Sequence, residues 1–326
     1  MPNKKFKIII TDCDHPSVEI EKKILSEINS ELTLETCKTE EDVIAVASDA
    51  DGIINQYAPF TRKVIKSLNR CKIIARYGVG VDNIDVEAAT EQHIIVANVP
   101  DYCLDEVSTH ALGLILASAR KIIFLDRKVR ERTWDFKIAK PLFRTQGKIL
   151  GLFGLGRIAR MVAQKALGFG FKVIAFDPYV SEANSKIEMV TLKRLLSDSD
   201  FLSIHVPLTD ETRHSFSENK LRTMKKTAYL VNTSRGPIVD EKALYVALKE
   251  KWIAGAALDV MENEPPDWED PLLKLDNVII TPHSSFYSEE SYVELKTKVA
   301  ESVRSVLQGE LPRAMVNPQV IKRKIL

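Results

Sequence analysis

The 326-residue sequence lacks the excess of one charge that marks many binding proteins. Its 46 lysines and arginines almost balance 45 aspartates and glutamates, which leaves a formal net charge of +1. Proteins that bind nucleic acid or a membrane surface carry a basic excess or a basic stripe, so neither partner is expected. Long apolar runs are also missing, since none reaches the roughly 18 residues that a membrane span needs.

Cysteine is scarce as well. The four cysteines lie far apart, and no two of them form a Cys-x-x-Cys pair. This spacing excludes a disulfide framework and a zinc site, and it predicts free thiols in a reducing compartment. The first residues lead into an apolar strand pattern without the apolar region of a signal peptide. We therefore expect a cytoplasmic protein without a metal site.

What the sequence does contain is a regular alternation of short apolar runs and helical patterns, which predicts parallel sheets covered by helices. The length also exceeds that of one usual domain. In the first block we expect strands at residues 6–11, 32–37, 52–55, 72–75 and 94–97, and helices at residues 18–28, 40–47, 61–68 and 86–92. In the second block we expect strands at residues 149–153, 172–176, 201–206, 228–232, 254–259 and 278–281. These six strands with helical crossovers predict a doubly wound, or Rossmann, dinucleotide-binding domain.

Two further helices decide the expected domain boundaries. A long helix at residues 105–130 carries too many apolar residues for one stripe, which indicates burial between domains or subunits. An amphipathic helix at residues 289–307 and a proline-rich tail are too short for a domain of their own, so we expect them to pack on the first block. The predicted domains are a discontinuous substrate domain, residues 1–102 with 291–326, and a dinucleotide-binding domain, residues 103–290.

A glycine-rich turn joins the first strand and the first helix of the second block. Gly154 and Gly156 let the backbone approach a pyrophosphate at the helix N-terminus, and the small Ala159 lets the helix lie close to the strand. Asp177 ends the next strand, where a carboxylate accepts hydrogen bonds from the ribose of NAD and repels the 2′-phosphate of NADP. Taken singly, these residues also fit an ordinary tight turn and an Asp-Pro turn, and FAD or a methyl donor uses a similar turn. Their combination favours NAD.

Three ionisable residues, Arg235, Glu264 and His283, follow predicted strand ends, where ligands bind in open α/β sheets. Each alone fits an ordinary loop residue. Oxidation of a 2-hydroxy acid needs a base for the hydroxyl proton, a cation for the carboxylate and carbonyl oxygen, and a nicotinamide to take the hydride. His283 suits the first role, and a carboxylate partner such as Glu264 favours its protonated form. Arg235 suits the second, because a guanidinium binds a carboxylate through two hydrogen bonds.

On these motifs the chain resembles the D-isomer-specific 2-hydroxyacid dehydrogenase family over essentially its whole length. The matching segments are residues 154–158, Asp177, and residues 205–209, 231–236, 255–260, 264–265 and 281–283. The resemblance implies that Arg235 binds and polarises the substrate, and that Glu264 pairs with His283, the acid/base. It also implies cofactor contacts from Gly154, Gly156, Arg157, Ile158, Asp177, His205, Pro207, Thr212, Thr233 and Asp259.

The same resemblance implies a substrate-binding loop in the first block. There, backbone N–H groups hold the substrate carboxylate and an arginine reaches the substrate, whereas a simple tight turn is the alternative. The matching residues are Arg76, Gly78, Val79 and Gly80. The expected architecture is a flavodoxin-like first domain completed by the C-terminal helix, a cleft that closes on the substrate, and a homodimer built on the long helix.

Within the family, residues 257–265 and 281–289 resemble the C-terminal binding protein branch, and the phosphoglycerate dehydrogenases next. Phe286 departs from the tryptophan of the first branch, and no second phosphate-binding arginine lies near Asn55, which disfavours phosphoglycerate as the substrate. Two hypotheses follow. One is an NAD-dependent dehydrogenase acting on a small 2-hydroxy or 2-keto acid, and the other is an NAD(H)-sensing interaction protein resembling the C-terminal binding protein corepressors. The intact catalytic set favours the enzyme, because sensing needs no proton relay.

Overall fold

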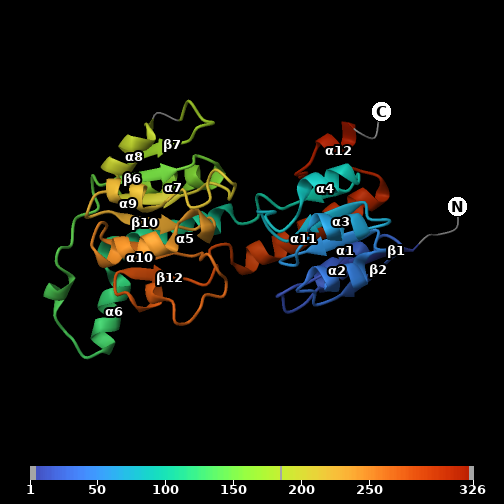
Figure 1. Ribbon diagram of the computed structural model, residues 1–326, viewed down its shortest axis with the longest axis horizontal. Helices are drawn as coiled ribbons and strands as arrows, with labels where there is room; N and C mark the ends of the chain where they lie inside the picture. Colours follow the sequence, from blue (N-terminus) through green and yellow to red (C-terminus); the bar gives the residue numbers. More distant parts are fainter. Residues whose placement is uncertain (1–4, 184–185, 323–326) are drawn as a thin grey trace. The chain divides into compact units, whose positions relative to one another are not determined.

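The computed structural model describes residues 5–183 and 186–322. It divides into two compact units: Met1–Cys103 with Ser288–Leu326, and Leu104–Tyr287. In Figure 1 the blue and cyan segments and the red C-terminal helices make up the first unit, so that unit is built from both ends of the chain.

The first unit contains one five-stranded parallel sheet with the order β2-β1-β3-β4-β5, which is the flavodoxin-like order. The strands are β1 (Phe6–Ile10), β2 (Ser30–Leu34), β3 (Gly52–Asn55), β4 (Ile73–Arg76) and β5 (Ile95–Ala97). The helices are α1 (Glu19–Leu25), α2 (Glu40–Ala47), α3 (Arg62–Ser67), α4 (Val86–Glu91), α11 (Glu289–Gln308) and α12 (Gln319–Lys322). The second strand begins and ends earlier than the predicted residues 32–37, and α1 is shorter than the predicted residues 18–28.

Helix α11 packs on α1, β3 and β4 of the first unit. Its N-cap, Ser288, exchanges hydrogen bonds with Ser291 in a capping box, and Gly309 ends the helix in a left-handed conformation. Its apolar face includes the buried Leu295, Val299 and Val303. The C-terminal helix thus supplies part of the core around the first sheet.

The second unit contains a seven-stranded parallel sheet with the order β12-β11-β10-β9-β6-β7-β8. The strands are β6 (Ile149–Phe153), β7 (Lys172–Phe176), β8 (Ile187–Met189), β9 (Phe201–Ile204), β10 (Tyr229–Asn232), β11 (Gly255–Leu258) and β12 (Val278–Ile280). With β6 counted as strand 1, the strands β6 to β11 have the Rossmann order 3-2-1-4-5-6, and β12 lies beyond β11. The predicted fold class is therefore confirmed. The prediction of six strands missed β8, which has only three residues, one of them buried.

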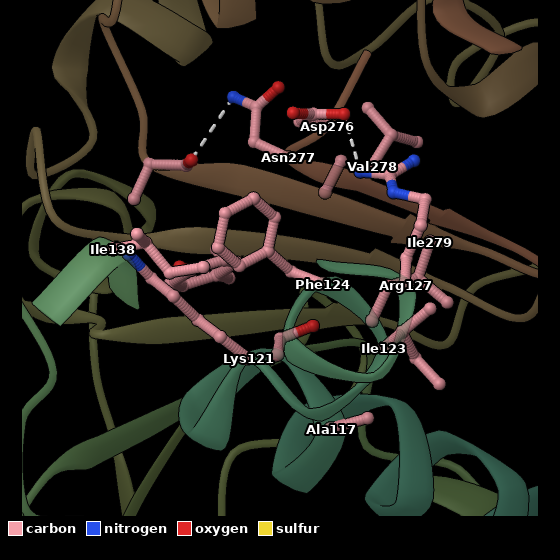
Figure 2. A pocket seen from close by; sticks show the side chains of 14 residues that line it. Ala117, Lys121, Ile123, Phe124, Arg127, Ile138, Asp276, Asn277, Val278 and Ile279 are labelled. Atoms are coloured by element: carbon pink, nitrogen blue, oxygen red, sulfur yellow. Dashed lines mark hydrogen bonds and ion pairs between the residues drawn. The ribbon is translucent and has the colours of Figure 1, made fainter. Parts of the chain in front are cut away.

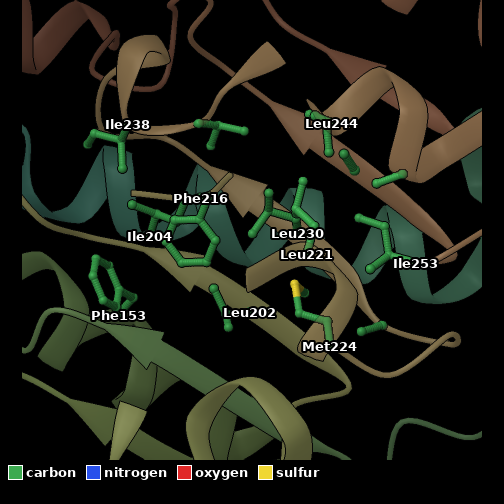
Figure 3. Close-up of a cluster of buried hydrophobic side chains, with 14 of the residues drawn as sticks. Phe153, Leu202, Ile204, Phe216, Leu221, Met224, Leu230, Ile238, Leu244 and Ile253 are labelled. Carbon is green, nitrogen blue, oxygen red and sulfur yellow. The ribbon is translucent and has the colours of Figure 1, made fainter. Parts of the chain in front are cut away.

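Helices cover both faces of this sheet, and successive residues of a strand enter different cores. The helices are α5 (Leu104–Arg120), α6 (Ile122–Arg130), α7 (Arg157–Gly168), α8 (Leu192–Asp198), α9 (Glu218–Thr223) and α10 (Glu241–Lys249), with the 3-10 turns η1 (Phe136–Ala139), η2 (Gly236–Ile238) and η3 (Pro271–Lys274). Leu230 joins the core beneath α8, α9 and α10, whereas its neighbour Val231 joins the core beneath α5 and α7. Figure 3 shows the first of these cores, in which Phe216 lies among strand and helix side chains. Burial on both faces explains the continuous apolar strand patterns.

The single helix predicted over residues 105–130 is wrong. Lys121 adopts a left-handed conformation, with φ +51°, and separates α5 from α6. The bend between the two helices is 61°. Helix α5 has eight buried residues, whereas α6 has none. Among the described residues no single helix has the length and apolarity of a membrane span, and only the bent pair α5 and α6 meets that test together.

Candidate active site and cofactor site

The glycine-rich turn connects β6 to α7. Gly154 has φ +93°, and a Cβ there would lie 2.7 Å from the carbonyl oxygen of His205, so the turn requires glycine. Gly156 is the N-cap of α7, makes no side-chain cap hydrogen bond, and has open space where a Cβ would stand. The first N–H groups of this 12-residue helix are therefore available to a pyrophosphate.

Asp177 follows β7 beside the glycine-rich turn. One carboxylate oxygen accepts a hydrogen bond from the Leu155 N–H at 2.8 Å, and the other accepts one from the Tyr179 N–H at 2.9 Å. These two contacts fix the carboxylate against the turn. Each oxygen keeps a further lone pair for the predicted ribose hydroxyls.

Four other predicted cofactor residues lie on the loops after β9 and β10: His205, Pro207, Thr212 and Thr233. The Thr233 hydroxyl is buried and has no hydrogen-bond partner among the described residues. The His205 ring meets the Ser203 hydroxyl at 2.9 Å, and burial lowers the pKa of the imidazole to about 4. Thr212 donates a hydrogen bond to the Pro207 carbonyl at 2.7 Å, which fixes that loop. A buried hydroxyl without a partner is costly, and a bound ligand would satisfy it.

Asp259 follows β11 and is almost fully buried, with 1% of its surface exposed. Its carboxylate accepts hydrogen bonds from the Ser284 and Ser285 N–H groups at 3.0 and 2.9 Å and from the Thr281 hydroxyl at 2.5 Å. Its backbone carbonyl accepts a hydrogen bond from the His283 N–H at 2.7 Å. These contacts hold His283 in a left-handed conformation, with φ +48°, which is unfavourable for a residue other than glycine.

His283 and Glu264 form a hydrogen-bonded pair, with 2.6 Å between Nδ1 and a carboxylate oxygen. The other Glu264 oxygen accepts a hydrogen bond from the Met261 N–H at 3.0 Å. Burial alone raises the pKa of Glu264, but the hydrogen bond and charge of His283, the Met261 N–H and the charge of Arg235 outweigh it and lower the pKa below its ordinary value. The carboxylate is therefore ionised at neutral pH, and it leaves Nε2 as the ring nitrogen for a substrate.

Arg235 lies on the turn after β10, next to the turn that carries Glu264. The Asn232 side chain donates a hydrogen bond to the Arg235 carbonyl at 2.8 Å. A Cβ on the neighbouring Gly236 would lie 1.9 Å from the Met261 carbonyl carbon, so the two turns touch through their backbones. The structure thus brings together all three predicted catalytic residues, which come from the ends of three adjacent strands.

The predicted substrate loop lies in the first unit, after β4. Gly78 has φ +136°, and its carbonyl accepts a hydrogen bond from the Val99 N–H at 2.9 Å. The Val79 carbonyl accepts one from the Asn98 side chain at 2.6 Å. Arg76 is the last residue of β4 and is partly buried. The loop therefore has a fixed backbone with the conformation that glycine permits.

Sequence reasoning missed several residues that support the site. His110, on α5, contacts the Thr281 hydroxyl at 3.0 Å and lies 3.4 Å from the Asp259 carboxylate. Glu241 and Glu262 each accept a hydrogen bond from the backbone N–H of the other, at 2.7 and 3.0 Å, which ties α10 to the turn bearing Glu264. Burial and the neighbouring carboxylates raise the pKa of Glu241 to about 7. Nothing local in the sequence signals these contacts, since each joins residues far apart in the chain.

A doubly wound sheet with an uncapped glycine turn and a histidine–glutamate pair at its carboxyl edge defines a dinucleotide-dependent dehydrogenase. Comparison with known proteins makes the class specific. Residues 112–285 match the family described as "D-isomer specific 2-hydroxyacid dehydrogenase, NAD binding domain". The chain belongs to this family. It is an NAD-dependent oxidoreductase of 2-hydroxy acids and the corresponding 2-keto acids.

Two relatives illustrate the similarity. Glyoxylate reductase of Korarchaeum cryptofilum is 42% identical over 318 residues, which cover 93% of this chain and 95% of that protein. D-3-phosphoglycerate dehydrogenase of Methanocaldococcus jannaschii is 43% identical over 325 residues, covering 98% of this chain but 61% of that protein. The chain thus spans only part of the length of this second relative. Such relatives favour the enzyme over the cofactor-sensing interaction protein.

Solved structures share the fold over nearly the whole chain. A glyoxylate reductase from Paecilomyes thermophila has a TM-score of 0.87 with 31% identity, and the match covers 98% of this chain and 100% of that one. A D-lactate dehydrogenase from Aquifex aeolicus, complexed with NAD and lactic acid, has a TM-score of 0.86 with 28% identity, covering 95% and 98%.

Proposed function

We propose that this enzyme interconverts a small 2-keto acid and the D-2-hydroxy acid through His283, Glu264 and Arg235. The observation that carries the proposal is the 2.6 Å hydrogen bond between His283 and an ionised Glu264. The pair orients the imidazole and sets a negative charge beside Nδ1, which is what a general acid for 2-oxo acid reduction requires. In the oxidation direction the neutral ring takes the hydroxyl proton.

The other two roles follow from charge and position. Arg235 binds the substrate carboxylate and polarises the carbonyl oxygen with its guanidinium. NAD, when bound, supplies or accepts the hydride. Asp259 positions His283. Its carbonyl accepts a hydrogen bond from the His283 N–H, and its carboxylate accepts hydrogen bonds from the N–H groups of the next two residues, Ser284 and Ser285.

We propose that the cofactor lies along the residues predicted for it. The N-terminus of α7, with Gly154, Gly156, Arg157 and Ile158, binds the pyrophosphate. Support comes from the uncapped helix and from the partnerless buried hydroxyl of Thr233. The remaining residues of this proposed binding surface are Asp177 for the ribose, with His205, Pro207, Thr212 and Asp259.

For the substrate we propose a small unphosphorylated 2-oxo acid: glyoxylate, whose product glycolate is achiral, or hydroxypyruvate or pyruvate, whose products glycerate and lactate carry the D configuration. Glyoxylate reductases are among the relatives that match nearly full length. Asn55 marks the place near which phosphoglycerate dehydrogenases are expected to carry a second phosphate-binding arginine. Its side chain is fully buried, donates a hydrogen bond to the Ala58 carbonyl at 3.0 Å and accepts one from the Asn83 side chain at 2.9 Å. It offers no cation to a phosphate. The loop of Arg76, Gly78, Val79 and Gly80 is proposed to bind the substrate carboxylate with its N–H groups.

The test is a panel of 2-keto acids assayed by loss of NADH. We expect turnover of glyoxylate, with 3-phosphohydroxypyruvate a poorer substrate. If the phosphorylated acid has the higher kcat/KM, the substrate proposal is wrong. If no 2-keto acid is reduced while a stoichiometric peptide partner is recovered with NADH bound, the protein is a sensor instead.

We also propose a homodimer that uses α6 and the segment after it. Five large apolar side chains there are exposed: Ile122 (53%), Ile123 (52%), Val129 (47%), Trp134 (89%) and Phe136 (76%). Phe124 and Ile138 of the same segment face a pocket of about 150 Å³, which is shown in Figure 2. A patch of this kind is typical of an interface. Light scattering should give twice the chain mass of 36.7 kDa. Trp134→Asp should give the monomer mass, whereas Trp268→Asp, at a residue exposed elsewhere, should not; a monomeric wild type would contradict the proposal.

A cytoplasmic location is proposed on the cysteines. All four, Cys13, Cys37, Cys71 and Cys103, are free thiols in the structure. Free thiols are typical of proteins in reducing compartments. Fractionation of the native host that recovers the enzyme outside the cytoplasm would contradict this assignment.

A further inference from the structure

A charged cluster is buried in the first unit next to the proposed substrate loop. Glu21 of α1 and Lys296 of α11 are 0% and 5% exposed, and 3.6 Å separates a Glu21 carboxylate oxygen from the Lys296 ammonium. The other Glu21 oxygen accepts a hydrogen bond from the Tyr77 hydroxyl at 2.7 Å, and Tyr77 is 2% exposed. These three residues come from distant parts of the sequence, and Tyr77 lies between Arg76 and Gly78 of the loop.

The two charges of this cluster are not needed to join the helices that carry them. Helices α1 and α11 pack on each other, and Leu25 and Leu295 are buried apolar side chains of the two helices. Taking an ion pair out of water often costs more than its attraction returns, and apolar side chains of similar volume often stabilise a protein as well or better. The burial of Glu21 with Lys296 is therefore explained by what the pair holds, which is the Tyr77 hydroxyl.

The surroundings keep the Tyr77 hydroxyl a proton donor to Glu21. The His15 ring packs edge-on against Tyr77, with 4.8 Å between the ring centroids, and burial lowers the pKa of His15 to about 4, so the ring is uncharged at neutral pH. Lys296, which also donates a hydrogen bond to the Ser17 carbonyl, is the cation that faces Glu21. Burial and the charge of Glu21 raise the pKa of Tyr77, so its hydroxyl keeps its proton. A hydrogen bond to a carboxylate is stronger than one between neutral groups, so the cluster fixes this hydroxyl firmly.

The loop that follows Tyr77 uses some of its N–H groups to hold itself in place. The Tyr77 N–H donates a hydrogen bond to the last carbonyl of β3 at 2.8 Å, and the Gly78 N–H donates one to the carbonyl two residues before it at 2.9 Å. Among the described residues, the N–H groups of Val79 and Gly80 have no acceptor. Tyr77 and Gly78 are buried, whereas Val79 is exposed and Gly80 is partly exposed. The loop thus has an anchored start at Tyr77, directly followed by two N–H groups that are available to a carboxylate.

We propose that Tyr77 is a positioning residue for substrate binding, and that Glu21 and Lys296 hold its hydroxyl for this purpose. The inference rests on the proposed function, in which this loop binds the substrate carboxylate. With the hydroxyl fixed, the N–H groups of Val79 and Gly80 are held in place before the substrate arrives, so less ordering accompanies binding. The carboxylate is bound alike in the ground state and the transition state, so loss of this support raises KM for the substrate and leaves kcat nearly unchanged.

The experiment compares two tyrosine variants of the full chain in steady-state kinetics, with saturating NADH and the 2-keto acid that wild type reduces best. Tyr77→Phe removes one hydroxyl and keeps the ring beside His15. We expect its KM for the keto acid to rise about tenfold, with kcat within about threefold and the Kd for NADH within about twofold of wild type. Tyr292→Phe is the matched control, because it removes a hydroxyl that contacts the same His15 ring from α11, outside the loop. Its KM should stay within about twofold of wild type.

A second pair of variants separates positioning from stability. Glu21→Met leaves Lys296 buried without its partner, so it should lower the melting temperature and raise KM. E21M/K296M removes both charges, so it should melt at a higher temperature than Glu21→Met. Its KM should nevertheless stay about tenfold above that of wild type, because Tyr77 still lacks its acceptor. If the cluster served stability alone, KM would recover together with the melting temperature.

The outcomes distinguish this inference from the proposed function. A wild-type KM in Tyr77→Phe or in E21M/K296M, or an equal rise of KM in Tyr292→Phe, overturns the role of Tyr77 and leaves the proposed function intact. A wild type that reduces no 2-keto acid overturns the proposed function, and this inference with it.

Discussion

The two edges of the seven-stranded sheet carry charge in opposite ways. At the carboxyl edge, His283 and Glu264 form a pair, and Asp259 is surrounded by N–H and hydroxyl donors. At the amino edge, six basic residues around one pocket have no carboxylate within ion-pair distance among the described residues: Lys121, Lys140, Arg144, Lys226, Lys249 and Lys251. Paired and hydrogen-bonded charges are held in place for chemistry, whereas the unpaired cations of the other edge are not fixed by a partner.

Replacing His283 gives the largest expected difference between the edges. His283→Ala should lower kcat for keto acid reduction by about 10²–10⁴, because the general acid is lost. The affinity for NADH should stay unchanged. Lys249→Gln, at the amino edge, should leave kcat within twofold as the matched control. A similar loss in both variants would mean that the edges are not functionally distinct.

A second prediction concerns the contact between the turns of Arg235 and Glu264. Gly236→Ala should lower the free energy of unfolding by about 3 kcal/mol, since the added Cβ would meet the Met261 backbone at 1.9 Å. Gly113→Ala, in α5 with nothing within 4 Å, should stabilise the protein by up to about 1 kcal/mol. Urea unfolding measures both. Equal stability of the two variants would show that the turns do not touch.

The third prediction is a shift in pH dependence. The pKa of Glu264 is lowered, so its negative charge lies beside Nδ1 of His283 from mildly acidic pH upward. Glu264→Gln removes that charge, so the pH optimum of keto acid reduction should move down by about one unit. A pH–rate profile of kcat/KM checks this. An optimum that does not move would exclude the electrostatic role of Glu264.

Cofactor selectivity is the smallest expected effect. Asp177→Ala removes a hydrogen-bond acceptor and a negative charge beside the turn, so the preference for NAD over NADP should fall about tenfold, or 1.4 kcal/mol. The ratio of kcat/KM with the two reduced cofactors measures it. Unaltered selectivity would place the discrimination in another residue.

Local patterns were enough to predict much of the carboxyl edge. Apolar strand runs and the glycine turn depend on near neighbours in the chain. Arg235, Glu264 and His283 lie three, six and three residues after the ends of β10, β11 and β12. Parallel topology then brings such residues to one edge.

The rest depends on contacts between distant segments. No glycine or proline marks the break between α5 and α6, so the sequence around Lys121 did not predict its left-handed conformation. The pocket at the amino edge collects basic residues from positions 121 to 251, which lie far apart in the sequence. Its positive charges do not show in the overall composition, because 46 basic residues are almost balanced by 45 acidic ones. A count of charges along the sequence therefore cannot reveal a pocket that folding assembles.

The most direct test of the account follows NADH formation from separate D and L enantiomers of glycerate and lactate, with wild type and His283→Ala side by side. The account predicts NADH from a D enantiomer only, and none above background with the variant, which still binds NADH. Oxidation of an L enantiomer, or turnover by His283→Ala equal to that of wild type, would contradict it.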